Sequence, residues 1–345
     1  MSHRFLNPTK RLVVWLLAVF VLVGCSDSAK EQLVGFDGST MGTSYSLRWV
    51  AKDDYQVAEI QQAVEERLAV INQQMSTYVP ESEISRFNTL RSGEMPVSAE
   101  LAGLVQRSQA ISEQTDGAFD ITVGPLVNLW GFGPKGRVIS APSADKIASI
   151  RTRVGYQKLG VSQNPPLLKK SNNLQVDLSA IAKGYAVDQL ASLFLGKGIN
   201  NYLVEIGGEL KLSGNKPNGE SWKIAIEAPL TTERSAQHVL PISNIAMATS
   251  GDYRNYFEED GVRYSHTINP LTGAPIKHAL VSVTVLHPSC ADADALATAL
   301  MVMGDKKGIE FAERHDLAAY FLIKVQESTE FESIATAKFD ALLKK

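Results

Sequence analysis

The chain has 345 residues, 44% of them hydrophobic, which is enough for one large domain or two closely joined ones. Its 34 basic and 37 acidic residues give a formal net charge of -3 without a basic run, so a nucleic-acid partner is not expected. Two cysteines and six scattered histidines exclude a zinc or iron–sulfur site.

The N-terminus has the pattern of an export signal, because basic residues precede an apolar run at 12–23. A transmembrane helix needs roughly 20 apolar residues, so this run is short for one. Leu22-Val-Gly-Cys25 closes it and resembles the lipobox of bacterial lipoproteins, in which the cysteine is acylated and becomes the new N-terminus. An ordinary cleaved signal or a short anchor is the alternative. Lipid on Cys25 would leave Cys290 unpaired, so no disulfide is expected.

The chain therefore divides into a lipoprotein signal peptide at 1–24, a lipidated cysteine and polar tether at 25–35, and one domain at 36–345. Within the domain, alternating apolar and polar residues predict a strand at 45–49. Apolar residues that recur every three or four positions predict helices. The other predicted elements are a helix that starts at Val57 and is ended by Pro80, a helix from Leu101 that stops at Thr115, helices at 180–194 and 293–303, and strands at 202–206, 222–226 and 281–285.

This mixture predicts an α+β fold, with a large mixed unit and an intimately packed second lobe. Five short segments combine glycine with polar residues in a way that suits backbone contact with a phosphate. Any one of them alone is more easily explained as a hairpin turn. The segments are Gly38–Gly42, Thr115–Thr122, Glu205–Glu209, Ala248–Asp252 and Ser265–Gly273.

Asp294 and Thr298 lie one turn apart on the predicted helix at 293–303, so their oxygens face one side. Oxygen ligands suit Mg²⁺ or Ca²⁺, and Mg²⁺ takes further ligands from water and substrate phosphates. Helix capping by Asp292, with Asp294 favouring the helix dipole, explains the same spacing equally well.

His266 lies in a Gly/Pro-rich segment, where it is either a general base or a solvent-exposed turn histidine. The segment Gly131–Gly136 matches G-x-G-x-x-G but lacks the strand before it and the helix after it that a dinucleotide fold requires. The chain has neither a Walker phosphate loop nor a G-x-S-x-G hydrolase elbow.

Taken in order, the motifs of this chain resemble those of the bacterial FAD:protein FMN transferases, the ApbE family, from about Phe36 to beyond Met303. The motifs that carry the resemblance are Thr40–Thr43, Met75–Tyr78, Ser85–Asn88, Thr115–Pro125, Leu129–Pro134, Val176–Asp188, Val204–Gly208, Thr249–Asp252, His266–Pro270 and Ala293–Ala295.

The resemblance implies a Mg²⁺-dependent enzyme that moves the FMN half of FAD onto a Thr or Ser hydroxyl of an acceptor protein and releases AMP. It implies Mg²⁺ ligation by Asp294, Thr298 and the main-chain carbonyl of Ala180. It also implies an FAD site between the two lobes, lined by Met41, Tyr78, Ala118, Phe119, Asp120, Asp177, Lys183 and Ile268.

The acceptor hydroxyl needs a base, and we assign His266 first, with Asp294 or Asp252 in reserve. Three other readings remain open: an FAD pyrophosphatase that yields FMN and AMP, a lipid-anchored flavin-binding protein without catalysis, and, more remotely, a serine hydrolase that uses Ser250, Asp252 and His266.

Together with the lipobox, these features predict an enzyme on the periplasmic face of a bacterial membrane, the inner membrane favoured and the outer still open. The expected acceptor is an exported or membrane flavoprotein, with a membrane redox complex as the first candidate.

Overall fold

The computed structural model describes residues 31–52, 57–136, 140–227, 236–251, 256–259, 262–325 and 330–344. The predicted signal peptide and the lipidation site Cys25 lie outside these residues, as does Asp252. Over the described ranges, no helix combines the length and the apolar character needed to cross a membrane.

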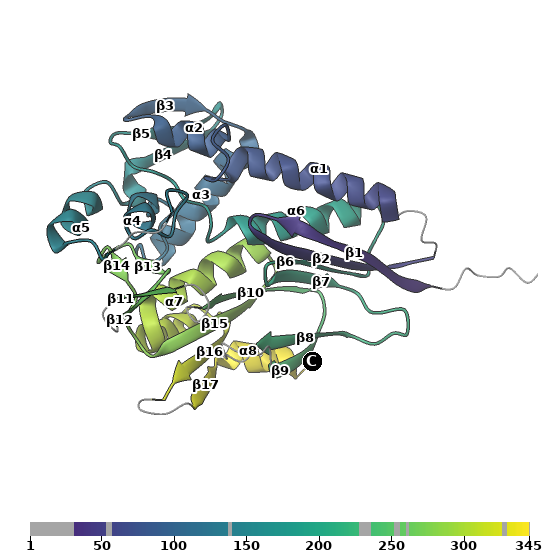
Figure 1. The fold of residues 1–345 in the computed structure, drawn as a ribbon. Coiled ribbons are helices and arrows are strands. Elements are labelled where there is room, and N and C mark those ends of the chain that lie inside the picture. Colours follow the sequence, from purple (N-terminus) through teal and green to yellow (C-terminus); the bar gives the residue numbers. More distant parts are fainter. Residues whose placement is uncertain are drawn as a thin grey trace, which may run out of the picture.

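An eight-stranded antiparallel sheet forms the centre of the described part of the chain (Figure 1). Its order, β1-β2-β6-β7-β10-β15-β16-β17, places β2 beside β6, although about 150 residues separate them in sequence. The strands are β1 (Gln32–Thr40), β2 (Thr43–Ala51), β6 (Tyr202–Ile206), β7 (Glu209–Ser213), β10 (Ile245–Gly251), β15 (Leu280–His287), β16 (Ala318–Lys324) and β17 (Phe331–Ala335).

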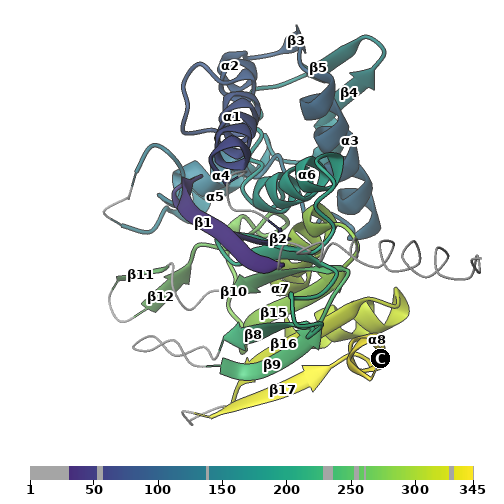
Figure 2. The ribbon, with the colours of Figure 1, turned by 90° about the vertical axis from the view of Figure 1, so that its right-hand side faces the viewer.

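Most of the helices lie on one side of this sheet, where α6 and α7 pack on its strands and α1 lies over α6 (Figure 2). The helices are α1 (Val57–Met75), α2 (Glu83–Thr89), α3 (Ala99–Gln114), α4 (Gly124–Leu129), α5 (Ala144–Arg151), α6 (Ala182–Gly196), α7 (Cys290–Arg314) and α8 (Ala337–Leu343), with a 3₁₀ turn at Tyr156–Lys158.

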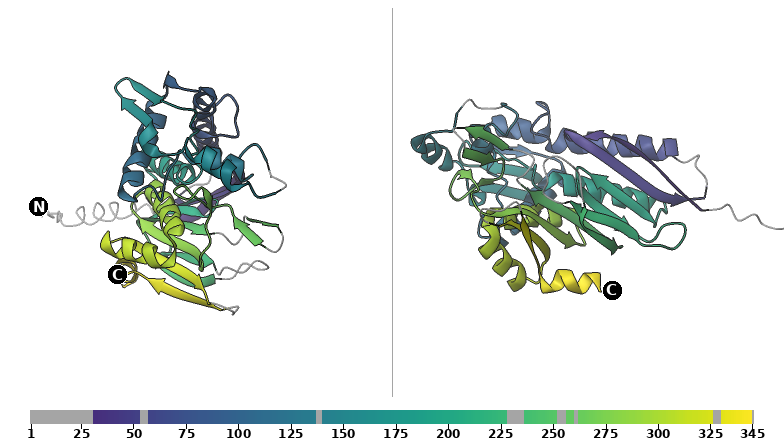
Figure 3. Two further views of the ribbon diagram at one scale, coloured as in Figure 1. Left: turned by 90° about the vertical axis from the view of Figure 1, so that its left-hand side faces the viewer. Right: turned by 60° about the horizontal axis from the view of Figure 1, so that its bottom comes forward.

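The other face of the sheet is covered by the hairpin β8–β9 and by α8 (Figure 3). β8 is Trp222–Glu227 and β9 is Ala236–Ile242. The remaining strands form small sheets away from the centre: β3 (Gly93–Pro96), β4 (Leu159–Gln163) and β5 (Pro166–Lys170), then β11 (Tyr256–Glu259) with β12 (Val262–Ser265), and β13 (Ile268–Asn269) with β14 (Ala274–Pro275).

Two hydrophobic cores lie on the two faces of the sheet, because successive strand residues point to opposite sides. On β10, Ala246 and Ala248 belong to the core under the helices, whereas Met247 belongs to the core under β8, β9 and α8. A third, smaller cluster joins Leu126 of α4 and Trp130, the C-cap of this helix, with Ile268 of β13. The combination of this helix-covered sheet with separate small sheets confirms the predicted α+β fold.

The helix predicted from Val57 is confirmed, but it ends at Met75, before the expected end at Pro80. The strand predicted at 202–206 is confirmed with the same ends, and the other predicted helices and strands are present with shifted ends. The helix predicted at 293–303 is longer, since α7 starts at Cys290 and continues to Arg314 through a kink at Gly304, where φ is 82°. Strand β1, which begins at Gln32 inside the expected tether, was not predicted. It is a mostly half-exposed edge strand without a clear apolar alternation.

Candidate functional site

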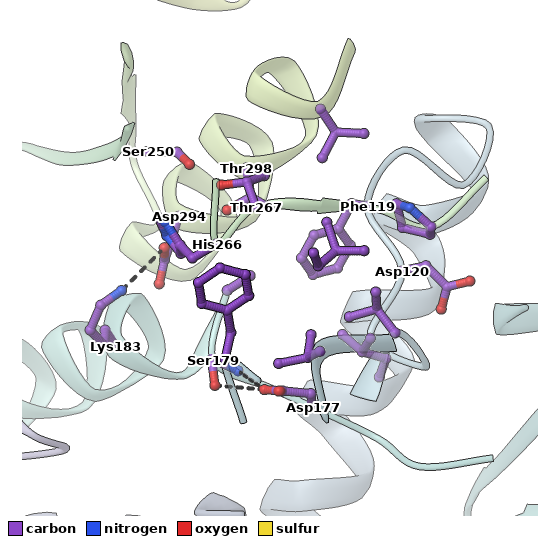
Figure 4. A pocket seen from close by; sticks show the side chains of 18 of the residues that line it. Phe119, Asp120, Asp177, Ser179, Lys183, Ser250, His266, Thr267, Asp294 and Thr298 are labelled. Carbon is purple, nitrogen blue, oxygen red and sulfur yellow. Dashed lines mark hydrogen bonds and ion pairs between the residues drawn. The ribbon is translucent and has the colours of Figure 1, made fainter. Parts of the chain in front are cut away.

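A cavity of about 410 Å³ is lined by residues of α6 and α7, of the loop that follows α3 and of the segment 266–270 (Figure 4). Its size is typical of small-molecule sites, and its wall mixes apolar side chains with a few charged ones. The wall is made of Tyr78, Ala118, Phe119, Asp120, Ile121, Val123, Val127, Phe132, Asp177, Ser179, Ala180, Lys183, Gly207, Glu209, Thr249, Ser250, Gly251, His266, Thr267, Ile268, Pro270, Asp294, Thr298 and Val302.

Most of the residues predicted for the site come together here, although they are spread from position 78 to position 298. The predicted residues that line the cavity are Tyr78, Ala118, Phe119, Asp120, Asp177, Ala180, Lys183, His266, Ile268, Asp294 and Thr298. Met41 does not line it. It sits in the β1–β2 hairpin turn, where Met41 has φ 50° and Gly42 has φ 75°.

Asp294 and Thr298 are presented by the N-terminal part of α7, and several contacts fix this part of the helix. The Ser289 hydroxyl caps the helix by accepting from the backbone N–H of Asp292 at 3.2 Å. Asp188 of α6 accepts from the Ser289 hydroxyl at 3.0 Å and from the N–H of Ala291 at 3.1 Å. The start of α7 is therefore bonded to α6.

Asp292 is not the helix cap that the sequence analysis considered. It is 5% exposed and accepts hydrogen bonds from both Nε and Nη2 of Arg107 on α3. This pairing raises the pKa of Arg107. The capping explanation for Asp292 is wrong, and the carboxylate instead ties α7 to α3.

Gly184 allows α6 and α7 to approach each other closely beside the cavity. A Cβ atom at this position would lie 2.3 Å from the carbonyl oxygen of Cys290. The N–H of Gly184 also donates to Asp294 Oδ2 at 3.1 Å. Any residue larger than glycine would therefore disturb the position of Asp294.

Lys183, Glu209 and Asp294 form a charged cluster at one end of the cavity. Lys183 Nζ lies 3.1 Å from Glu209 Oε1 and 3.7 Å from Asp294 Oδ1. Burial alone would lower the pKa of Lys183, but the two carboxylates outweigh burial and raise it. Burial raises the pKa of Glu209, while the Lys183 ammonium opposes that change. Burial is the larger effect, so the pKa of Glu209 rises to about 8.

Asp120 organises the loop that follows α3. Its Oδ1 accepts from the N–H and the hydroxyl of Thr122, both at 2.7 Å, and its Oδ2 accepts from the N–H of Tyr156 at 2.8 Å. Burial raises the pKa of Asp120, and these hydrogen bonds oppose the change. Because both oxygens already accept from the chain, Asp120 shapes the cavity by holding Phe119 and Ile121 in place.

Asp177 plays a similar part at the entry to α6. Its Oδ1 accepts from the N–H of Ser179 at 2.9 Å and from the Ser179 hydroxyl at 2.6 Å. The N–H of Asp177 donates to the carbonyl of Ile121 at 2.7 Å, which joins this turn to the loop of Asp120. The turn places the main chain of Ala180 at the cavity.

Aromatic rings line the part of the cavity near its mouth. The rings of Phe132 and His266 meet edge to face with their centroids 6.3 Å apart. Tyr78 is 64% exposed, and its hydroxyl lies 3.4 Å from the carbonyl oxygen of Phe132. With the buried Phe119, these rings suit a flat ring system such as a flavin or a purine.

The donors near Asp294 are hard oxygens, which fit Mg²⁺ better than a softer ion. Among the residues that the structure describes, no group of three or more His, Cys, Asp and Glu side chains could hold a metal. A cation here would depend on the Asp294 carboxylate, the Thr298 hydroxyl, the Ala180 carbonyl and oxygens of a ligand. The 3.7 Å from Lys183 exceeds hydrogen-bond length, so Asp294 Oδ1 is open to such an ion.

Several wall residues lie in segments singled out from the sequence but were not predicted as site residues, chiefly Phe132, Ser179 and Glu209. Phe132 lies inside the G-x-G-x-x-G match that the missing dinucleotide-fold context ruled out. Glu209 had a usable signal, because it directly follows two glycines, and Gly207 and Gly208 have φ of 62° and 105°. A charged residue that enters a strand from such a turn is a candidate for an inward-facing side chain.

Comparisons with known proteins give one consistent result. The ApbE family model matches residues 41–321. A curated protein of Vibrio cholerae serotype O1, named FAD:protein FMN transferase, is 43% identical over 336 residues, which cover 96% of this chain and 99% of the relative. A protein of the same name from Escherichia coli K12 is 40% identical over 341 residues, covering 96% and 97%.

Solved structures give the same picture. The flavin transferase ApbE from Vibrio cholerae has a TM-score of 0.83 at 41% identity and covers 91% of this chain and 100% of that one. The apo form of the flavinyl transferase ApbE from Pseudomonas stutzeri has a TM-score of 0.83 at 42% identity, with coverages of 91% and 98%.

Proposed function

This chain belongs to the ApbE family, and from that premise we propose that it is a Mg²⁺-dependent enzyme that transfers the FMN half of FAD to a protein. The acceptor is a Thr or Ser hydroxyl, the new bond is a phosphoester, and AMP is released. One observation carries the proposal: a single cavity joins the oxygen donors of Asp294 and Thr298 to an aromatic wall.

The reaction exchanges one phosphorus–oxygen bond for another. The acceptor oxygen attacks the phosphorus of the FMN half, the bond from this phosphorus to the bridging oxygen breaks, and AMP leaves with that oxygen. The hydroxyl proton must pass to a base, since a neutral hydroxyl is a weak nucleophile. His266 lines the cavity and is our first choice for this base, with Asp294 as the alternative. Asp252 lies outside the described residues.

Asp294, Thr298 and the Ala180 carbonyl would hold Mg²⁺, which would neutralise charge on the phosphoryl oxygens. The chain supplies further positive charge through the Lys183 ammonium, whose raised pKa keeps it protonated at neutral pH. Tyr78, Phe119 and Ile268 would bind the flat ring faces of FAD. Asp120 and Asp177 hold the loops that carry this wall.

We also propose that the enzyme is anchored on the periplasmic face of a bacterial membrane through lipid on Cys25. The sequence supports this, since an apolar run ends in the lipobox-like Leu22-Val-Gly-Cys25. FAD must then be present on that side, and the acceptor must expose its hydroxyl there. A membrane redox complex with a covalent flavin fits both conditions.

The test is to incubate the purified protein with FAD, MgCl₂ and a candidate acceptor domain, and to weigh the acceptor by mass spectrometry. We expect the acceptor to gain the mass of FMN less one water, and AMP to appear in equal amount. Free FMN with an unmodified acceptor would instead indicate an FAD pyrophosphatase. Bound FAD with no AMP released would indicate a flavin-binding protein without catalysis.

A further inference from the structure

Glu209 is a cavity residue whose role the proposed chemistry leaves open. It is 3% exposed and stands at the first position of β7, directly after the Gly207–Gly208 turn. Its Oε1 lies 3.1 Å from Lys183 Nζ. Its Oε2 is buried, and no hydrogen-bond partner for it is present among the described residues. A buried carboxylate with a partner for only one of its two oxygens needs an explanation beyond packing.

The distances show which carboxylate holds Lys183. At 3.1 Å, the contact with Glu209 Oε1 has hydrogen-bond length, whereas the 3.7 Å to Asp294 Oδ1 is an ion pair without a hydrogen bond. An ammonium has three donors and can use both oxygens of one carboxylate. Lys183 can therefore donate a second hydrogen bond to Glu209, at the open Oε2.

The charges of the three groups also indicate that Glu209 holds Lys183. Lys183 with Asp294 alone would be a neutral pair, and the ammonium would occupy the side of Asp294 that faces the cavity. Glu209 adds one negative charge and attracts the ammonium toward itself. With Glu209 ionised, the three groups carry a net charge of -1, which favours a divalent cation beside Asp294.

We propose that Glu209 is a positioning residue that holds Lys183 away from Asp294, so that Asp294 Oδ1 is free to bind the divalent cation. This inference rests on the proposed function, because it assumes a cation at Asp294. When the cation is bound, Lys183 gives up Asp294 and bonds to both oxygens of Glu209. Glu209 thus acts on the cation through Lys183 and not as a ligand.

The experiment titrates Mn²⁺ alone into the purified full-length protein and follows free Mn²⁺ by electron paramagnetic resonance. For Glu209→Gln we expect a dissociation constant at least tenfold above wild type, since the ammonium then competes for Asp294. For the double variant Glu209→Gln/Lys183→Met we expect a return to within threefold of wild type. Glu94→Gln makes the same substitution at an exposed position of β3 and should bind like wild type.

Melting without metal separates positioning from a purely structural role. Lys183 keeps Asp294 as a partner in Glu209→Gln, so we expect its melting temperature to stay within about 3 °C of wild type, a change of roughly 1 kcal/mol. Unchanged Mn²⁺ binding by Glu209→Gln would overturn the inference. A double variant that binds as weakly as the single one would also overturn it, because Glu209 would then be a ligand. Failure of the wild type to bind Mn²⁺ would instead remove the proposed metal site itself.

Discussion

The close approach of α6 and α7 at Gly184 should control both the stability and the turnover of this protein. In Gly184→Ala, the new Cβ would lie 2.3 Å from the carbonyl oxygen of Cys290, 2.6 Å from its carbonyl carbon and 2.8 Å from the nitrogen of Ala291. These are backbone atoms of α7, so no side chain can swing away. Ordinary contact begins at 3.4 Å, and the helices must therefore separate by about 1 Å.

We expect Gly184→Ala to have a moderate effect on stability and a large effect on turnover. Overpacking of this kind costs about 1 to 3 kcal/mol, which should lower the melting temperature by several degrees. Gly184 also donates to Asp294 Oδ2, so the shift moves Asp294 relative to Lys183. Since a misplacement of about 1 Å can cost roughly 100-fold in rate, we expect turnover to fall by about that factor.

The assay combines thermal melting with AMP release from FAD in the presence of an acceptor. Gly196→Ala is the matched control, because Gly196 ends the same helix and a Cβ there meets nothing within 4 Å. The control should melt at or above the wild-type temperature and keep its turnover. If Gly184→Ala behaved like Gly196→Ala in both measurements, the packing argument for this site would be wrong.

Three further predictions concern the metal, a buried lysine and the anchor. Asp294→Asn should lower AMP release by roughly 100-fold or more while the circular dichroism spectrum stays unchanged, and full AMP release would contradict the metal assignment. Burial lowers the pKa of Lys170 to about 8, so the unfolded chain binds this proton more tightly than the folded protein between pH 8 and 10.5. The free energy of unfolding should thus rise over this window by roughly 2 to 3 kcal/mol more in wild type than in Lys170→Met, and equal pH profiles in urea melts would refute this. The Cys25→Ser variant should be absent from the membrane fraction after cell fractionation. It should also lose any preference for a membrane-tethered acceptor over a free one.

Sequence reasoning predicted those parts of the fold whose signals are local. The apolar spacing of α1 is visible over 19 consecutive residues, and its predicted start at Val57 was confirmed. The edge strand β1 was missed, because its residues are half exposed and its pairing with β2 is decided by backbone hydrogen bonds. Gly304 interrupts α7 with a φ of 82°, which the apolar spacing before it does not indicate.

The site, like the fold, has features with local sequence signals and features that form only between distant segments. The motifs pointed to most of the cavity wall, since glycine and hydroxyl residues cluster within each short segment. The pairing of Lys183 with Glu209 and Asp294 could not be predicted, because it joins a helix, a hairpin and a second helix that meet only in the folded chain. The same holds for Arg107 and Asp292, which are 185 residues apart in sequence.

The strand that sequence reasoning missed also limits where the proposed acceptor can be. β1 starts at Gln32, paired with Ala51, and ends at Thr40 beside the hairpin turn. Ser44, just after this turn, accepts from the N–H of the cavity residue Gly207, so the cavity lies at the far end of β1 from the tether. Nine strand residues span roughly 27 Å, and the seven steps from Cys25 to Gln32 reach at most about 25 Å. A lipid on Cys25 would therefore keep the cavity within about 50 Å of the bilayer, which favours acceptors that are themselves bound to that membrane.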